Sequence, residues 1–152
     1  MRRKDKEIKD KAEMEAILAK ADLCHLALVD DDGPYATPVN FGYENGAIYF
    51  HSATAGRKIE AIRKNPRVSF CVYADYKLLV GEKACECTAA YRSVMGVGRA
   101  EIISDPAEKR KGLEVVMKHH GATKIDFIEG VLNVTAVVKI NVESMTGKKS
   151  KV

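Results

Sequence analysis

The segment "IYFHSATAGRKIEAI", residues 48–62, gathers several phosphate-binding groups at one place. It begins as an apolar strand and ends as a basic amphipathic helix. A helix N-terminus carries unpaired N–H groups and partial positive charge, and phosphate binds there readily. Gly56 lets a ligand approach the backbone closely, and the other contributors are side chains that suit an anion: His51, Ser52, Thr54, Arg57 and Lys58. The segment predicts an anion site, with a capped surface helix bearing solvated charges as the alternative.

Two other segments could add to such a site. In "YRSVMGVG", residues 91–98, side chains alternate along a strand, so that Ser93 or Arg92 could reach the same phosphate from a neighbouring strand. In "TPVNFGY", residues 37–43, Pro38 cannot donate to a ladder, and an irregular strand leaves backbone groups free to bond a planar heterocycle. Ordinary strand structure is the alternative for both segments.

The cysteines do not predict a metal site. Cys85 and Cys87 form a C-E-C pair on one face of an expected strand, but no second Cys or His cluster has ligand spacing. We expect all four cysteines, Cys24 and Cys71 included, to be free thiols acting as small buried hydrophobes. The sequence contains no G-x-G-x-x-G or P-loop motif, so a nucleotide would not be held by those loops.

Hydrophobic periodicity and turn residues predict the elements that position these groups. Helices are expected at 10–20 and 56–64, and a third begins at the cap Asp105 and ends near Gly121. The stretch 76–83 is expected to be a loop. In the last strand Val138 points to the core, whereas Val137 lies on a half-apolar face expected to meet another subunit. The six expected strands are 23–30, 35–43, 47–52, 67–75, 85–103 and 134–144, the first three forming an antiparallel meander.

Length, composition and charge limit which classes of protein this sequence can belong to. The 152 residues, 46% hydrophobic and 30% charged, suit a single domain, 1–152. The net charge of +4 comes from residues 1–9 and 148–152, which are expected to be flexible basic ends; the body is slightly acidic, so no nucleic-acid partner is predicted. No apolar run approaches the roughly 20 residues that span a bilayer, and no secretory signal follows the basic start. We therefore expect a cytoplasmic location and no membrane partner.

Six antiparallel strands with peripheral helices favour a barrel or a sandwich. Five motifs make the expectation sharper, because they occur in the order seen in a known family. They are "PVNFGY", "IYFHSATAGRK", "NPRVSF", "YRSVMGVGRA" and "ESMTGK". Together they resemble the FMN-binding split-barrel superfamily of pyridoxamine 5′-phosphate oxidase, and within it the nitroimidazole-resistance (Nim-like) branch. The resemblance covers roughly Ile17 to Lys148.

The resemblance implies a mainly β fold: a six-stranded antiparallel split β-barrel with peripheral α-helices. It further implies a homodimer with FMN in clefts between the subunits. Three groups of residues would form each site. The phosphate would be held by His51, Ser52, Lys58 and Arg57, and Ser93 and Arg92 would approach it from the second barrel segment. The isoalloxazine ring would be lined, largely through backbone, by Val39, Asn40 and Phe41. The pocket would be completed by Ala53, Tyr91 and Val94.

The implied function is that of an FMN-dependent oxidoreductase acting on a small molecule, with nitroimidazole-type reduction as the specific form. His51 and Tyr91 are the candidate proton donors. Oxidation of pyridoxamine phosphate is not expected, because the end Thr146-Gly147-Lys148 departs from the Arg-rich signature of the oxidase. One alternative is a module that carries flavin, deazaflavin or haem without turnover, with His25 and His51 as candidate haem ligands. The other is an interaction protein that uses its basic ends.

Overall fold

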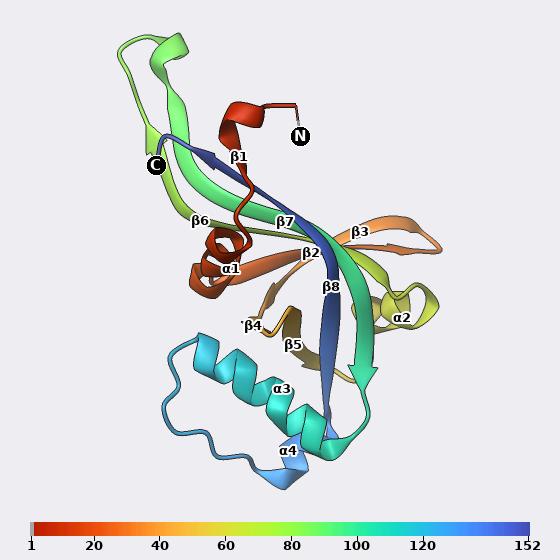
Figure 1. Ribbon diagram of the computed structural model, residues 1–152. Coiled ribbons are helices and arrows are strands. Elements are labelled where there is room, and N and C mark those ends of the chain that lie inside the picture. The colour runs from red at the N-terminus through yellow and green to blue at the C-terminus, as the bar shows by residue number, and fades with distance from the viewer. Residues whose placement is uncertain (1) are drawn as a thin grey trace.

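The computed structural model describes residues 2–152, which form one antiparallel sheet with helices around it (Figure 1). The helices are α1 Lys11–Lys20, α2 Arg57–Lys64, α3 Pro106–His119 and α4 Glu129–Asn133, with short 3-10 turns η1 Lys4–Lys6 and η2 Ala84–Glu86. The strands are β1 Glu7–Ile8, β2 Leu23–Asp30, β3 Gly33–Asn40, β4 Gly42–Glu44, β5 Ala47–Ala53, β6 Arg67–Leu79, β7 Thr88–Ile103 and β8 Thr135–Ser150.

The mainly β, antiparallel class with peripheral helices is confirmed, but the strand count is eight rather than six. The strand order is β3-β2-β6-β7-β8-β5-β4, and β1 pairs with β8. Within residues 2–152 the sheet is not closed, because no ladder joins β3 to β4. The two strands beyond the expected six are β1 and β4. No helix described between residues 2 and 152 is long and apolar enough to cross a bilayer.

The expected strand 35–43 is divided at Phe41, and this changes the topology. Phe41 is fully buried in the core, so the chain leaves β3 there and re-forms as β4. β3 pairs with β2, whereas β5 pairs with β4 and β8. Both antiparallel pairings of the predicted meander are therefore present, but its middle strand is broken into two. β3 and β4 are consecutive in the chain but stand at opposite ends of the strand order.

β6 contains a bulge next to the stretch 76–83, which the sequence predicts to be a loop. Asp75 has φ +57°, and the β6–β7 register shifts between Ala74 and Lys77. The bulge interrupts the alternation of buried and exposed residues, but pairing resumes and β6 continues to Leu79. The predicted loop is wrong for residues 76–79. The resulting β6–β7 hairpin projects well beyond the rest of the sheet (Figure 1).

The two basic ends meet in the sheet. β8 continues to Ser150, and Glu7 and Ile8 of β1 pair with Lys148 and Gly147. Polar contacts join the same regions: Lys6 Nζ lies 2.7 Å from Ser150 Oγ, and Lys149 Nζ lies 2.9 Å from a carboxylate oxygen of Glu13. Residues 7–8 and 148–150, expected to belong to flexible ends, are thus paired strand residues.

Side chains on the two faces of β5 and β8 enter two separate clusters. Val138 is fully buried in the main core, as predicted. Val137, on the opposite face, is also fully buried, but under α3 with Val115 and Val116. Gly112 permits this close approach, since a Cβ there would lie 2.8 Å from Val137. The expectation that this face meets another subunit is therefore corrected for Val137, because a helix of the same chain covers it.

The predicted ends of α3 are confirmed. The Asp105 side chain accepts a hydrogen bond from the backbone N–H of Glu108 at 2.9 Å, and Pro106 occupies the first helical position. Gly121 follows the helix with φ +86°, a conformation that glycine adopts without strain. The helix between these ends packs on β4, β5 and β8, and it forms one wall of the site described below.

Gly96 on β7 offers a test of sheet packing. A Cβ at Gly96 would lie 2.4 Å from the Phe70 ring and 2.6 Å from the Ser144 carbonyl oxygen. We expect Gly96→Ala to lower the free energy of unfolding by about 1–3 kcal/mol, because the core is overpacked. Urea unfolding measures the change. Gly130→Ala is the matched control, since nothing lies within 4 Å of its Cβ position, and an equal loss there would contradict the packing account.

Candidate functional site

The junction between β5 and α2 has the form of an anion site. β5 ends at Ala53, and Gly56 precedes α2 with φ +117°. No side chain caps the N-terminus of α2, and nothing lies within 4 Å of the Gly56 Cβ position. The first N–H groups of α2 therefore have no side-chain cap, and an uncapped helix N-terminus suits a phosphate group.

Arg57 and Lys58 differ in their availability to a ligand. Arg57 makes a two-point contact with Asp30, at 2.6 and 3.1 Å, and its guanidinium lies 4.6 Å from the centre of the Tyr35 ring. This hydrogen bonding from Arg57 lowers the pKa of Asp30. Lys58 is half-buried with Nζ 5.6 Å from the centre of the Phe50 ring, and no salt bridge engages it within residues 2–152. Lys58 is therefore the cation free to meet an anion.

His51 and Ser52 point to opposite faces of β5. Phe50 and Ile48 belong to the main core, and Ser52 continues their face toward Lys58. Tyr49 packs in the cluster under α3, and the exposed His51 continues that face. The sequence predicts that His51 and Ser52 both bind the phosphate, but in the structure only Ser52 is on the same face of β5 as Lys58.

Residues 39–41 lie beside the end of β5. β3, which ends at Asn40, is in contact with β5, although the two strands are not paired in the sheet. Asn40 is exposed, whereas Val39 and Phe41 are buried. Residues 39–41 therefore lie near β5. Because Val39 and Phe41 are buried, mainly backbone groups and the Asn40 side chain are accessible to a ligand.

A histidine of α3 fixes one end of this segment. The His119 ring lies 4.7 Å from the Phe41 ring, and His119 Nε2 lies 2.8 Å from the carbonyl oxygen of Ala21. His119 therefore links the C-terminal turn of α3 to the residue that follows α1.

Residues 91–94 do not reach the junction within one chain. On β8, His51 pairs with Val137 and Ser93 pairs with Lys148. These positions are eleven residues apart, roughly 35 Å along the strand. Val94 is fully buried in the core, so it cannot complete a pocket through its side chain. The expectation that Ser93 or Arg92 reaches the same phosphate from a neighbouring strand is not met in a single chain.

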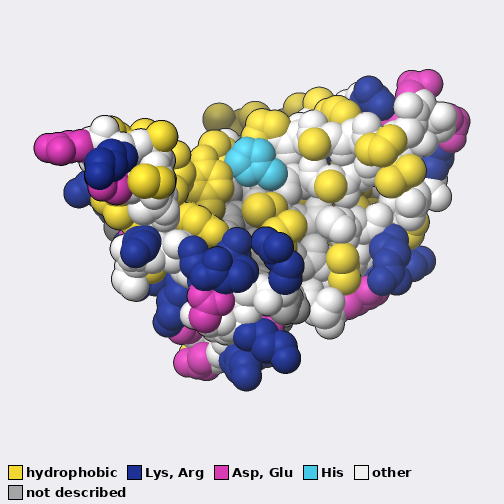
Figure 2. All heavy atoms as spheres, turned by 90° about the horizontal axis from the view of Figure 1, so that it is seen from above, with side chains coloured by type: hydrophobic (Ala, Val, Ile, Leu, Met, Phe, Trp, Pro, Cys, Tyr) yellow, Lys and Arg dark blue, Asp and Glu magenta, His cyan; other side chains and the backbone are white. Residues whose placement is uncertain are grey.

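Tyr91 and Ser93 instead line a shallow hollow of about 360 Å³ on the outer face of the β6–β7 hairpin, with Cys71, Tyr73, Tyr76 and Ala89. Large hydrophobic side chains are exposed beside it: Tyr73 is 50% and Met95 58% exposed. Seen from the end that carries the hairpin, hydrophobic side chains gather along one side of the surface and Lys and Arg along the other (Figure 2). Such an apolar face is typical of a surface that is covered by another molecule.

Arg92 is held by Asp75 at the bulge of β6. Arg92 Nη1 lies 2.7 Å from Asp75 Oδ2, and Lys20 pairs with the other carboxylate oxygen. Asp75 adopts φ +57°, which few residues other than glycine, asparagine and aspartate adopt. The bulge therefore places a carboxylate that orients the Arg92 guanidinium.

This cluster predicts a pH dependence of stability. Hydrogen bonds from Lys20 and Arg92 lower the pKa of Asp75. Since the folded-state pKa lies below the unfolded one, near 3.9, the stabilisation is complete above that value and is lost as pH falls through the folded-state pKa. We expect Asp75→Asn, which tolerates positive φ, to lower Tm at pH 7. The difference from wild type should shrink toward pH 3, and a constant difference would refute the ion-pair account.

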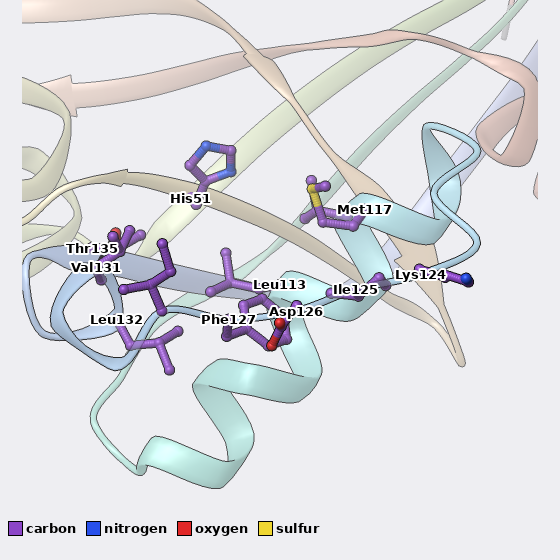
Figure 3. Close-up of a pocket in the computed structure, with 12 residues that line it drawn as sticks. His51, Leu113, Met117, Lys124, Ile125, Asp126, Phe127, Val131, Leu132 and Thr135 are labelled. Atoms are coloured by element: carbon purple, nitrogen blue, oxygen red, sulfur yellow. Dashed lines mark hydrogen bonds between the residues drawn. The ribbon is translucent and has the colours of Figure 1, made fainter.

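His51 stands at the rim of a pocket that the sequence did not predict. The pocket has a volume of about 340 Å³. Apolar side chains from α3, α4 and the segment between them converge in it, with His51 above them (Figure 3). The lining residues are His51, Leu113, Val116, Met117, Lys124, Ile125, Asp126, Phe127, Ile128, Val131, Leu132 and Thr135.

His25 and the cysteines lie outside this arrangement. His25 is exposed, with its ring 6.1 Å from Tyr73. Burial raises the pKa of the Cys24 thiol to about 12. Cys85 and Cys87 are exposed at η2, so the expectation that they are buried is wrong; the chain forms a turn there instead of a strand. Among the residues described, no three His, Cys, Asp or Glu side chains are grouped to hold a metal ion.

The chain is similar to known proteins over nearly its whole length. The model of the pyridoxamine 5′-phosphate oxidase family matches residues 10–149. The crystal structure of a candidate 5-nitroimidazole antibiotic resistance protein from Bacteroides thetaiotaomicron is 35% identical; the match covers 93% of this chain and 85% of that chain, with a TM-score of 0.84. No curated protein matches the chain.

Two further solved structures share the fold. The flavocytochrome Anf3 from Azotobacter vinelandii is 25% identical, and the match covers all of this chain and 72% of that one, with a TM-score of 0.85. A FAD- and haem-binding protein from Mycobacterium smegmatis is 22% identical over 97% of this chain and 74% of that one, with the same TM-score. The chain belongs to the pyridoxamine 5′-phosphate oxidase family and, within it, to the nitroimidazole-resistance (Nim-like) branch.

Proposed function

We propose that the protein binds FMN and uses it as an oxidoreductase in the cytoplasm. The observation that carries the proposal is the β5–α2 junction. There the N-terminus of α2 has no side-chain cap, and Lys58, which forms no salt bridge among residues 2–152, lies near Phe50 on the face of Ser52. These groups fit a phosphomonoester, because the open space at Gly56 admits its oxygens to backbone N–H groups. The adjoining residues 39–41 present backbone to a planar ring.

A second copy of the chain would complete the site. In one chain Ser93 is roughly 35 Å along the sheet from His51, and Arg92 and Tyr91 are farther away. Tyr91 and Ser93 share the outer face with the exposed Tyr73, Tyr76 and Met95, whereas Arg92 lies on the opposite face with Asp75. Packing this face against a second copy would bury those side chains and bring the 91–93 segment to the cofactor of the other subunit. The proposed functional unit is therefore a homodimer.

The residues have separate tasks in this proposal. The cofactor, when bound, supplies the electrons. Lys58, Ser52 and the N-terminus of α2 hold its phosphate, while residues 39–41 orient its ring. His51 at the rim of the apolar pocket and Tyr91 of the second copy are placed to deliver protons from an imidazole nitrogen and a phenol oxygen. The proposed reaction is the reduction of a small molecule, with a 5-nitroimidazole as the first substrate to test.

Anaerobic turnover tests the enzymatic part of the proposal. FMN-loaded protein is mixed with NADH or NADPH and a 5-nitroimidazole, and loss of the nitro absorption is followed against free FMN. We expect turnover above free FMN, and a His51→Ala variant should be slowed by about 10²-fold if His51 donates the proton. Turnover equal to that of free FMN would refute the enzymatic role.

The second candidate is a module that binds flavin or haem without turnover of its own. It is favoured by the likeness of the whole chain to a flavocytochrome at 25% identity. Tight flavin or haem binding combined with turnover no faster than free cofactor would support this role instead.

A further inference from the structure

The outer part of the β6–β7 hairpin, residues 76–89 (the arm), exposes apolar side chains. Leu78 pairs with Ala89, which lines the outer hollow with Tyr91, so Leu78 lies on that outer face. Leu78 is 58% exposed and Val80 is 76% exposed. A two-stranded hairpin is only marginally stable by itself in water. An apolar face on a projecting hairpin therefore indicates that another surface packs against it.

A second apolar patch lies at the other end of the molecule, on α4 and just before β8 (Figure 1). Val131 is 54% exposed and Val134 is 67% exposed. Val131 also lines the apolar pocket with His51 at its rim (the His51 pocket). The wall that α4 gives to this pocket is thus partly open to solvent.

The two patches belong to the same face of the sheet, the one turned away from the main core. At the α4 end, Val137 of β8 is packed under α3 on this face. At the arm end, Val94 of β7 belongs to the main core, so its neighbour Ser93 is on the face away from the core. One face of the sheet therefore carries α3 and α4 at one end and the exposed arm at the other.

The ladders place both patches along the sheet. Ser93 and His51 mark two levels of the sheet through their pairing with β8. Leu78 lies four positions beyond the level of Ser93, because it pairs with Ala89. Four positions beyond the level of His51, the chain before β8 is at Asn133, where α4 ends. The arm and α4 are therefore equally far beyond these two levels.

A two-fold axis brings the two patches together. The proposed homodimer places the 91–93 segment of one copy at the level of His51 in the other, and in a two-fold dimer this contact occurs twice. An axis that exchanges these two levels also exchanges the levels beyond them. It lays the arm of each copy on α4 of the other, with Leu78 and Val80 against Val131 and Val134.

We propose that the arm packs on α4 of a second copy of this chain and closes the His51 pocket from that side. The inference rests on the proposed function in one respect, the homodimer. The contact buries apolar side chains on both copies, and the two patches carry it twice in each dimer. Each His51 pocket is then complete only in the dimer, because its outer wall comes from the other subunit.

Cross-linking tests the contact without FMN and without activity. The protein carries Leu78→Cys and Val131→Cys together and is treated with a short bismaleimide reagent. The other thiols that are not fully buried are removed by serine at Cys71, Cys85 and Cys87. We expect a covalent dimer on a denaturing gel.

The two single variants are matched controls. In the proposed dimer the two copies of Leu78 lie at opposite ends, and so do the two copies of Val131. Each single variant should therefore run as a monomer after the same treatment, while a mixture of the two should give covalent dimer. Cross-linking of Leu78→Cys alone would mean that the two arms meet each other, and would overturn the proposal.

Sedimentation of the otherwise unchanged protein measures the strength of the contact. We expect Leu78→Asp to weaken dimerisation by about tenfold or more, because a carboxylate would be buried against α4 without a partner. Lys77→Asp places the same side chain on the other face of the hairpin, at an exposed position. It should change dimerisation less than about twofold, and an equal effect of the two variants would overturn the proposal.

The outcomes separate this inference from the proposed function. A dimer that gives no cross-link in the double variant overturns the arm contact and leaves the proposed homodimer standing. A protein that sediments as a monomer overturns both. FMN binding is measured separately by titration of wild type, and failure to bind FMN would refute the proposed cofactor while the cross-linking result would still decide the arm.

Discussion

Lys58→Ala should weaken FMN binding roughly 10- to 150-fold. The expectation follows from the loss of a charge-assisted contact to the phosphate, worth about 1.5–3 kcal/mol. Lys58 is positioned for this contact, because its ammonium is near the Phe50 ring on the face of Ser52 and forms no salt bridge in the described chain. Equilibrium titration of cofactor-free protein with FMN, followed by flavin fluorescence, measures the change.

Lys64→Ala is the matched control on the same helix. Lys64 lies in the last turn of α2 and pairs with Asp31, away from the helix N-terminus. We expect its removal to change FMN affinity less than twofold. Arg57→Ala should have a smaller effect than Lys58→Ala, because the guanidinium is engaged by Asp30. If all three variants bound FMN as wild type does, the phosphate assignment at this junction would be wrong.

Val138→Asp should be the most destabilising of the substitutions considered. Val138 is fully buried in the main core, in a strand paired on both sides. A carboxylate there would have no partner, and we expect a loss of about 4 kcal/mol or more in the free energy of unfolding. Urea unfolding followed by circular dichroism measures the loss.

Asn141→Asp is the control for this substitution, since it places the same side chain at an exposed position of β8. We expect its unfolding midpoint to stay close to that of wild type. If Val138→Asp also melted like wild type, the two faces of β8 would be assigned backwards, and the position of His51 relative to the core would have to be revised.

Local patterns were sufficient for most elements. The caps at Asp105 and Gly121 and the proline at Pro106 define α3, and the alternating residues of 23–30 define β2 with the bounds found in the structure. The start of α2 was predictable for the same reason, because Gly56, Arg57 and Lys58 are adjacent in sequence. A helix N-terminus needs no long-range information to be recognised.

Features that depend on distant pairing could not be derived in this way. The place of Ser93, eleven residues along β8 from the partner of His51, is fixed by the register of two ladders. The break at Phe41 depends on the core that receives its ring. The His51 pocket was missed because residues 122–133 show no regular period; their only signal was a cluster of apolar residues such as Phe127 and Leu132 without an assigned element.

We propose above all that this chain is an FMN protein. The most direct test is the visible absorption spectrum of protein purified without added cofactor. Mass spectrometry of the ligand released on denaturation should follow. The account predicts flavin bands and release of FMN. A haem spectrum would leave the fold assignment intact but would replace the proposed flavin chemistry with haem chemistry. A colourless protein that also fails to take up added FMN would contradict the proposed function.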